Sequence, residues 1–376
     1  MKMLNNYSVL FFLVGIFFIA QPTYSQKEVD SILKSAKKQI YENPDEAILL
    51  ANEALDHPEL SVRNKIDALL VISTAHSSKR DYEKASDYII QINKLIPKIN
   101  DDLQKMNILN RIASHYQELQ IYDKALEYLD QSLILIESYP RKDSIQTYLG
   151  YNSILRGIIY RKQTNCDIAL KYFDEAIIAY NKTIARKPIM NANLSICYYN
   201  KGNCYLSLNK IVEAKESFKQ SIGHAEIIDA KSLIAFGQKG LAEAETVTGN
   251  YNEAMVLLTD ALTISQDVGD LVLNREIYEG LANNHLVLGD WDNYMLYQNK
   301  YVNAKRANKI SERKSINQSL IELTETKASE INHLQNFFRP IQIFFFIGIA
   351  IALFLLVRRI LKWEKELINL ENKLKN

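Results

Sequence analysis

The sequence is poor in the residues that interrupt helices. Only 12 of its 376 residues are glycine and 7 are proline, which disfavours a turn-rich β architecture and favours long helices. It also lacks an excess of either charge, with a formal net charge of +1, so its composition gives no sign of a nucleic-acid-binding surface. Because 47% of the residues are hydrophobic, the chain can form a packed core. We therefore expect an all-α fold.

Motifs for catalysis and metal binding are also absent. The six histidines form no HExxH pair, and neither a glycine-rich phosphate loop nor a GxSxG motif occurs. His76 and His285 stand where other segments of the chain carry tyrosine, which favours packing roles for both. We predict a protein that is not an enzyme, with no catalytic residues, no metal site and no cofactor.

Cysteine is equally scarce, with three residues in the whole chain. Cys197 and Cys204 lie seven positions apart on one predicted helix, about 10 Å along its axis, which is too far for them to bridge each other. Cys166 occupies a position that is aromatic in other segments. Small buried thiols are the favoured interpretation, and a disulfide between Cys166 and one of the other two stays open.

A short segment ending in alanine recurs along the chain. It reads NPDEA, DYEKA, IYDKA, NCDIA, KIVEA and NYNEA, and a degenerate seventh copy reads DWDNY. The segments end at Ala47, Ala85, Ala125, Ala169, Ala214, Ala254 and Tyr294. Successive ends differ by 38, 40, 44, 45, 40 and 40 residues. A period near forty is typical of a solenoid built from repeated units.

A small residue stands twelve positions before the end of every segment. These residues are Ser35, Ser73, Ala113, Gly157, Gly202, Ala242 and Ala282. Because the offset never varies, the differences in length fall between repeat units and not within them. Each unit is therefore predicted to be a rigid antiparallel helix pair, whose close approach requires two small side chains.

Larger residues keep helical spacing from these two positions. Tyrosine or histidine follows the small residue by three positions in most units, and a large apolar residue follows the alanine by four, as at Tyr160 and Phe173. The combined pattern resembles the tetratricopeptide repeat over residues 26–305, in about seven units. The period is longer than the family's usual length of roughly thirty-four residues, which longer helices or connections explain. The resemblance implies a solenoid of helical hairpins that binds a peptide or protein.

In tetratricopeptide arrays the first helix of each unit lines the concave surface, so the resemblance assigns two positions per unit to this face. They lie three before and one after the small residue. The predicted partner-binding residues are Asn110, Ser114, Tyr199, Asn203, Lys239, Glu243, Glu279 and Asn283. Asparagine and tyrosine can hold an extended peptide backbone, and an ordinary solvated helix face is the alternative. The family's basic carboxylate clamp is not reproduced, which argues against capture of a free peptide C-terminus by that mechanism.

Residues 1–25 have the features of a secretory signal peptide. Lys2 precedes an apolar run of about twelve residues, and the small residues Thr23 and Ser25 suit cleavage before Gln26. The run is short for a membrane span. An uncleaved anchor is the alternative, and a lipoprotein anchor is disfavoured because no cysteine follows the run.

A second apolar run, over residues 341–357, contains no charged residue. At ~1.5 Å per residue its seventeen positions cover about 26 Å, and flanking side chains extend it enough to cross a hydrocarbon core of roughly 30 Å. We predict a transmembrane helix at residues 340–359, with Pro340 in its first turn. Basic residues are concentrated on its C-terminal side, so the positive-inside rule places the C-terminus in the cytoplasm. The expected location is the inner membrane, single-pass, with the array outside the cytoplasm.

Two helical segments flank the predicted membrane helix. Residues 306–339 read as a charged helical stalk with a weak coiled-coil pattern. The short cytoplasmic helix, residues 360–376, has a heptad seam that is compatible with a homodimer and equally with an amphipathic helix lying on anionic lipid. The seam consists of Ile360, Trp363, Leu367, Leu370 and Leu374.

This order of segments resembles membrane-bound regulators of some Gram-negative bacteria, whose cytoplasmic end continues into a DNA-binding or kinase domain. The sequence stops at Asn376, so an output domain is either missing or supplied by a partner. We expect a non-enzymatic, membrane-anchored sensor or adaptor in signal transduction, which binds a peptide or protein partner in the periplasm and does not bind nucleic acid directly. The alternative is a structural scaffold for a cell-envelope complex.

Overall fold

The computed structural model describes residues 27–374, apart from 42, 59, 80, 269 and 270. The predicted signal peptide, residues 1–25, therefore lies outside the described residues. The chain divides into two compact units, the first ending at Ile316 and the second beginning at Asn317. Every regular element among the described residues is a helix, which confirms the all-α class.

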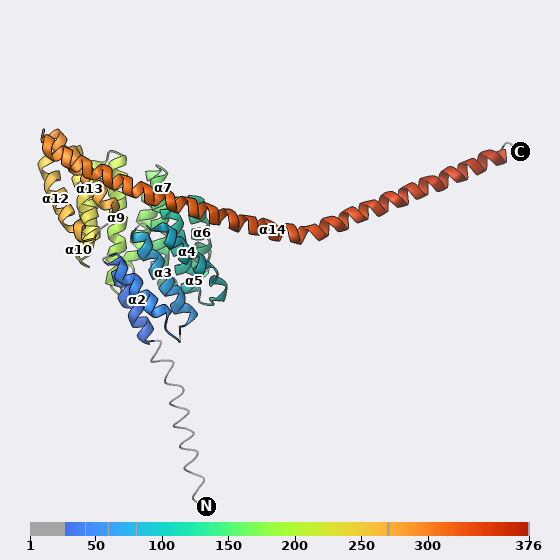
Figure 1. Ribbon diagram of the computed structural model, residues 1–376, viewed down its shortest axis with the longest axis horizontal. Coiled ribbons are helices and arrows are strands. Elements are labelled where there is room, and N and C mark those ends of the chain that lie inside the picture. The colour runs from blue at the N-terminus through green and yellow to red at the C-terminus, as the bar shows by residue number, and fades with distance from the viewer. Residues whose placement is uncertain (1–26, 42, 59, 80, 269–270, 375–376) are drawn as a thin grey trace, which may run out of the picture. The chain divides into compact units, whose positions relative to one another are not determined.

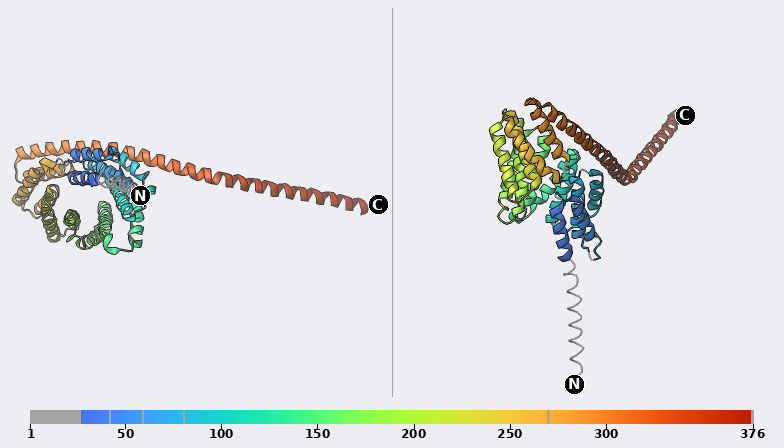
Figure 2. Two further views of the ribbon diagram at one scale, coloured as in Figure 1. Left: turned by 90° about the horizontal axis from the view of Figure 1, so that it is seen from below. Right: turned by 60° about the vertical axis from the view of Figure 1, so that its left-hand side comes forward.

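The first compact unit is a series of antiparallel helix pairs that stack in chain order (Figures 1 and 2). In the first pair, residues 27–39 pack against α2 (Pro44–Leu55). The pairs that follow are α3 (Val62–Ser78) with α4 (Tyr82–Asn93), α5 (Asp102–Glu118) with α6 (Tyr122–Ser138), α7 (Gln146–Lys162) with α8 (Cys166–Asn181), α9 (Asn191–Ser207) with α10 (Ile211–Glu226), α11 (Lys231–Val247) with α12 (Tyr251–Val268), and α13 (Leu271–Val287) with the start of α14 (Trp291–Leu374). Three short 3-10 helices lie between pairs: η1 (Ile96–Lys98), η2 (Lys142–Ser144) and η3 (Pro188–Met190). The predicted solenoid of about seven helical hairpins is confirmed.

The turn inside each pair is nearly invariant, and repeat length varies between pairs. From α3 onward, the first helix of every pair has 17 residues, and three residues join it to the second helix. The last residue of each turn donates its N–H to the carbonyl five residues earlier, as from Asp81 to His76 at 2.9 Å. This bond defines a Schellman motif. The middle residue has a positive φ at Gln120, Thr164, Asn209, Gly249 and Gly289. The constant offset in the sequence therefore reflects a hydrogen-bonded turn.

In the second to sixth pairs, the small residue of the first helix faces a large apolar residue of the second helix. A Cβ atom added to Gly157 would lie 2.5 Å from the ring of Phe173, and one added to Gly202 would lie 2.5 Å from the ring of Phe218. Where the second helix has a smaller side chain, the first helix has alanine or serine. These pairs are Ser73 with Ile89, Ala113 with Leu129 and Ala242 with Leu258. The close approach is as predicted. At Gly157 and Gly202 the phenylalanine ring limits the size of the residue, whereas Ser73 contacts the alanine itself, since its Oγ donates to the carbonyl of Ala85 at 3.0 Å.

Adding one methyl group at Gly157 should lower the free energy of unfolding by about 2 kcal/mol, because overpacking a well-packed core typically costs ~1–3 kcal/mol. Phe173→Leu removes the ring that this methyl meets. The two changes should therefore not be additive. The variant that carries both Gly157→Ala and Phe173→Leu should lose about 1 kcal/mol less free energy of unfolding than the two single variants lose together. Urea unfolding of the full chain, followed by circular dichroism, measures all three variants.

Gly223→Ala is the matched control for this cycle, since a Cβ atom there meets nothing within 4 Å. It should leave stability unchanged or raise it slightly, because alanine is the better helix former. Equal losses in Gly157→Ala and Gly223→Ala would contradict the packing described above.

Rings on the two helices of a pair also stack on each other. The stacks are His76 on Tyr88, Tyr116 on Tyr128, Tyr160 on Tyr172 and His285 on Tyr297, with ring centroids 5.5–5.9 Å apart. In addition, Nδ1 of His285 lies 3.0 Å from the carboxylate of Asp290 in the following turn. Both histidines therefore have the packing roles expected of residues that replace tyrosine.

A disulfide joins two consecutive helix pairs. Cys166 at the start of α8 is bonded to Cys204 in α9, with Cα atoms 5.2 Å apart, whereas Cys197 is free and buried. The favoured expectation of unpaired thiols is therefore wrong for Cys166 and Cys204 and confirmed for Cys197. Helix geometry could exclude a bond within α9, but only the packing of α9 against α8 brings the two bonded residues together.

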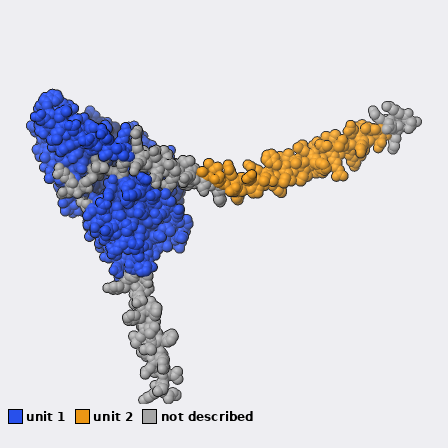
Figure 3. Space-filling view, in the orientation of Figure 1, with its two compact units in different colours: residues 1–316 blue, residues 317–376 orange. Residues whose placement is uncertain are grey.

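The second compact unit is shown in orange in Figure 3. Its described residues are all helical and belong to α14. Its segment Leu334–Leu370 is long and apolar enough to cross a membrane, and it includes the predicted span, residues 340–359. Pro340 lies inside α14, so the helix does not begin there as the sequence suggested. Because the predicted stalk, span and heptad segments belong to one continuous helix, their boundaries stay predictions.

Candidate functional site

The eight predicted partner-binding residues lie on the first helices of four pairs, in different environments. Ser114, Tyr199 and Asn203 are partly exposed, Glu243, Glu279 and Asn283 are exposed, and Asn110 and Lys239 are buried. No hydrogen bond or ion pair between described residues joins Ser114 to the rest of the set. The residues therefore lie along the array on α5, α9, α11 and α13, with no member on α7, and do not all meet in one cluster.

Asn110 has no accessible surface. Its amide donates to the carbonyl of Tyr148 at 2.9 Å and its side-chain oxygen accepts from the amide of Asn152 at 3.1 Å. Both bonds cross from α5 to α7, so they hold consecutive pairs together. Asn110 is a packing residue, and we remove it from the set that can face a ligand.

Lys239 is the centre of a charged cluster formed by α9, α11 and α13. Its Nζ atom lies 2.8 Å from the carboxylate of Glu276, 3.8 Å from that of Glu243 and 5.4 Å from the centroid of the Tyr199 ring. Burial lowers the pKa of Lys239, but Tyr199, Glu276 and Glu243 together outweigh burial and raise this pKa above its usual value. The lysine is thus a cation whose charge is balanced within the protein. The structure brings together three predicted residues here and adds Glu276, which the sequence pattern missed.

The remaining members of the row are less tightly held. Asn203 donates to the carbonyl of Tyr199 at 3.0 Å, within α9. Glu279 and Asn283 lie one turn apart on α13, and both side chains are exposed. These side chains are accessible to a ligand that runs along the first helices.

A small polar pocket lies beside Ser114 and was not predicted. Its volume is about 20 Å³, close to the space that one buried water needs. It is lined by Tyr41 and by side chains from three pairs: Leu70, Ser73, Thr74, Ser77, Ile89, Arg111, Ser114, His115, Glu118 and Tyr151. The guanidinium carbon of Arg111 lies 4.9 Å from the centroid of the Tyr151 ring, and its Nη1 donates to the Tyr151 hydroxyl at 3.4 Å.

Arg111 stands two residues before the small residue, where Val71, Leu155, Asn200, Gly240 and Gly280 stand in other pairs. A lone charge at an otherwise uncharged position was the signal that could have identified it.

Two titratable side chains of this pocket, Tyr41 and Arg111, shift each other's pKa. Tyr41 is 57% exposed overall but also lines the pocket, and burial raises the pKa of Tyr41 to about 12 against the opposing effect of Arg111, which is hydrogen-bonded to it. The neighbouring Tyr151 raises the pKa of Arg111. At neutral pH the pocket therefore presents a guanidinium cation beside a neutral tyrosine hydroxyl.

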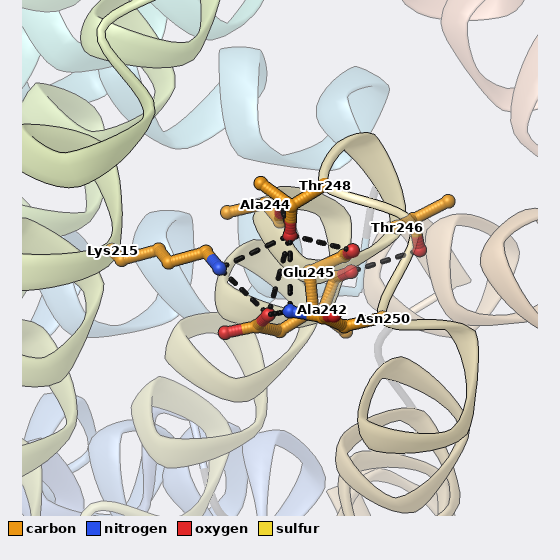
Figure 4. Close-up of polar contacts among 7 residues, drawn as sticks. All are labelled: Lys215, Ala242, Ala244, Glu245, Thr246, Thr248 and Asn250. Carbon is orange, nitrogen blue, oxygen red and sulfur yellow. Dashed lines mark hydrogen bonds and ion pairs between the residues drawn. The ribbon is translucent and has the colours of Figure 1, made fainter.

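A second polar cluster lies at the turn between α11 and α12 (Figure 4). Glu245 replaces the tyrosine or histidine of other pairs, and its Oε2 accepts from Nζ of Lys215 and from the amide of Asn250, both at 2.7 Å. Burial raises the pKa of Glu245, but the hydrogen bonds from Asn250 and Lys215 together outweigh burial. The pKa of Glu245 therefore lies below its usual value. Because its donors and acceptors satisfy each other, this cluster joins α10 to α11 and does not offer a ligand site.

No group of three or more His, Cys, Asp or Glu side chains that could hold a metal ion occurs in the part of the chain that the structure describes. His115, which lines the small pocket, is hydrogen-bonded through Nε2 to Oγ of Ser86 at 2.9 Å. The predicted lack of a metal site and of a cofactor stays a prediction.

Comparison with known proteins agrees with the repeat architecture. Residues 196–223, in α9 and α10, match the family model described as tetratricopeptide repeat. The structure is similar to that of a Rap protein complexed with competence and sporulation factor, at 14% identity and a TM-score of 0.55, over 75% of this chain and 78% of that one. It is also similar to NprR in complex with its cognate peptide NprX, at 13% identity and a TM-score of 0.52, over 82% of this chain and 89% of that one. No curated protein matches the sequence.

The chain is therefore a tetratricopeptide-like helical-repeat protein. The family model matches one helix pair, and the pairs from α3 onward share its Schellman turn. The pair α7–α8 also shares its packing of a glycine against a phenylalanine ring. At these identities the two solved structures support the fold alone.

Proposed function

We propose that the array binds an extended peptide, or an extended segment of a protein, along its first helices. The observation that carries this proposal is the set of accessible polar and aromatic side chains on three consecutive first helices, α9, α11 and α13, with Ser114 on α5 as a further accessible member. On the three helices they are Tyr199, Asn203, Glu243, Glu279 and Asn283. Such side chains can bond to a peptide backbone and stack on its side chains. The similarity in fold to NprR, whose structure contains its cognate peptide, supports the same class of ligand.

Peptide binding is tested with the full chain in lipid nanodiscs, screened against an immobilised library of random octapeptides. Wild-type protein should enrich a defined set of sequences. Asn203→Ala should weaken binding to that set about fivefold, the cost of roughly one hydrogen bond. Lys219→Ala, an exposed change on the second helix of the same pair, should leave binding unchanged. Failure of the wild-type protein to enrich any peptide would reject the proposal.

We also propose that the array lies outside the cytoplasm, with a single span in the inner membrane and the C-terminus inside. Three independent features support this topology. The first residues have the pattern of a signal peptide, and basic residues follow the apolar part of Leu334–Leu370. The third is the Cys166–Cys204 disulfide, because disulfides form and persist in oxidising compartments.

With this topology the protein acts as a non-enzymatic sensor or adaptor in signal transduction, and a passive scaffold for an envelope complex is the competing function. Replacing residues 340–376 with a lipid anchor separates the two. A transmembrane signaller loses its function in this variant because nothing crosses the membrane, whereas a scaffold keeps it. We expect loss of function in cells, measured as the phenotype of a deletion strain that carries the anchored variant.

A further inference from the structure

We propose that a second copy of this chain docks on an exposed apolar stripe at the start of α14, at the end of the array (Figure 1). The stripe consists of Trp291, Met295 and Val302, and we call it the end stripe. In the pair, the two α14 helices lie side by side and parallel, so that each residue of the stripe faces its own counterpart. The inference uses the proposed single membrane span for the direction of the helices and does not depend on peptide binding.

The position of Val302 is used in the preceding pairs for packing against the next pair. In α10 this position is Ile222, and a Cβ atom added to Gly237 of α11 would lie 2.6 Å from its Cγ1. Forty residues further along, Leu262 of α12 is 7% exposed and belongs to a core that includes residues of α13. After another forty residues, Val302 is 41% exposed. Among the described residues no helix pair follows α13 and α14, so a surface that is buried between pairs elsewhere faces solvent here.

The other two residues of the end stripe are more exposed still. Trp291 is 64% exposed and Met295 is 56% exposed, and spacings of four and seven residues place the stripe on one side of α14. By contrast Met255, the equivalent of Met295 in α12, is half-buried against the core between α12 and α13. Tryptophan is enriched among the residues that contribute most to protein interfaces. The end stripe therefore has the composition of an interface and not that of a terminal cap, whose outer face is polar.

The two ends of the array differ, which restricts how a second copy can dock. At the N-terminal end, the exposed side chains of residues 27–39 are lysine, glutamate, aspartate and serine. Head-to-tail stacking would join this polar face to the apolar end stripe. A two-fold pair joins the same surface on both copies, so that each end stripe covers the other.

The direction of the two helices follows from what lies beyond the stripe. Counting by sevens from Val302 leads through Lys309 to Ile316, the first apolar residue in the predicted stalk seam. A heptad register of this kind is typical of helices that pack in parallel. Two copies that each cross the membrane once, with the same topology, also have their α14 helices in the same direction.

Basic side chains separate the end stripe from the stalk seam. Arg306 and Lys309 share the register and are exposed, and their long side chains can keep the charged groups in water. A lysine within such a seam lowers stability but specifies register and the number of helices. The contact that we propose is therefore made by the end stripe and does not extend evenly along α14.

Disulfide crosslinking of the full chain in isolated membranes tests the pairing. In a Cys197→Ser background, Met295→Cys and Val302→Cys are each oxidised mildly, and covalent dimers are measured on non-reducing gels. Both should give dimers through identical positions. Ala307→Cys is the matched control, because it is exposed on the same helix but lies about 140° around the axis from Val302. It should give about tenfold less dimer.

A charge exchange across the two-fold axis provides the second measurement. Val302→Glu or Val302→Lys, each combined with Met295→Cys, places like charges opposite each other and should lower dimer formation about fivefold. Co-expression of the two, with different tags, should restore it in the mixed dimer. Circular dichroism checks that both variants fold, as expected for a partly exposed position.

Three outcomes would overturn the proposal. They are equal crosslinking at positions 295, 302 and 307, no crosslinking at the stripe, which would mean that a different partner covers it, and no recovery in the mixed dimer. None of these results bears on peptide binding by the first helices.

Discussion

Reduction of the Cys166–Cys204 disulfide should lower the free energy of unfolding by about 4 kcal/mol. The bond closes a loop with a sequence separation of 38 residues, and the chain-entropy treatment assigns about this stabilisation to a loop of such length. The bond also joins the fourth and fifth helix pairs. Because stability in a repeat array is a sum of local and neighbour terms, its loss should make unfolding less cooperative as well.

Urea unfolding of the full chain with and without a phosphine reductant measures this effect. A variant with alanine at both Cys166 and Cys204 should unfold alike in both conditions, whereas Cys197→Ala should respond as the wild type does, because Cys197 is free. Unchanged wild-type stability, under conditions where thiol titration shows that the bond has been reduced, would refute the prediction.

Acidification should destabilise the array through His115 by about 3 kcal/mol. The residue is 5% exposed, and burial lowers its pKa from 6.5 to about 4. As pH falls below 6.5 the unfolded chain binds a proton at His115 that the folded chain does not bind. The contribution of neutral His115 to the free energy of unfolding is therefore fully present above pH 6.5. It is lost progressively down to about pH 4, where the folded state also begins to bind the proton.

His115→Gln isolates this contribution, because glutamine can keep a bond to Ser86 but does not titrate. Free energies of unfolding at pH 7.5 and pH 4 are compared for the two proteins, so that the other titrating groups cancel. The wild type should lose about 3 kcal/mol more than His115→Gln. An identical pH dependence in both proteins would show that His115 is not protected from protonation in the folded state.

Features that depend on short-range geometry were predictable from the sequence. The twelve-residue offset predicted rigid hairpins, and the structure explains it by a Schellman turn of constant length, as from Asp81 to His76. Packing of the small residue against its partner also followed from helical spacing. The prediction that two small side chains allow this close approach was incomplete. A larger residue at Gly157 would clash with the ring of Phe173.

Features that depend on contacts between helix pairs were not predictable in the same way. Cys166 and Cys204 lie in different pairs, and the bond requires the stacking of α9 on α8. Asn110 satisfies the spacing of a ligand-facing residue, yet its bond to Tyr148 of α7 uses it for packing. Arg111 left a signal in its unusual charge, but most of the hydroxyl groups that line the pocket with it come from other parts of the chain, as Thr74 and Tyr151 do. A periodic pattern identifies one face of each helix, and the contacts between consecutive pairs, such as those of Asn110 with α7, decide which side chains remain accessible on that face.

The central claim is that the repeat array is displayed outside the membrane while the end of α14 lies inside. In a Cys197→Ser background, Glu137→Cys in α6 and Glu364→Cys in α14 each place one thiol at an exposed position. Cells with a permeabilised outer membrane are treated with a membrane-impermeant maleimide before and after lysis of the inner membrane. The account predicts that E137C is labelled in the unlysed cells and that E364C is labelled only after lysis. Labelling of E364C before lysis, or protection of E137C until lysis, would contradict it.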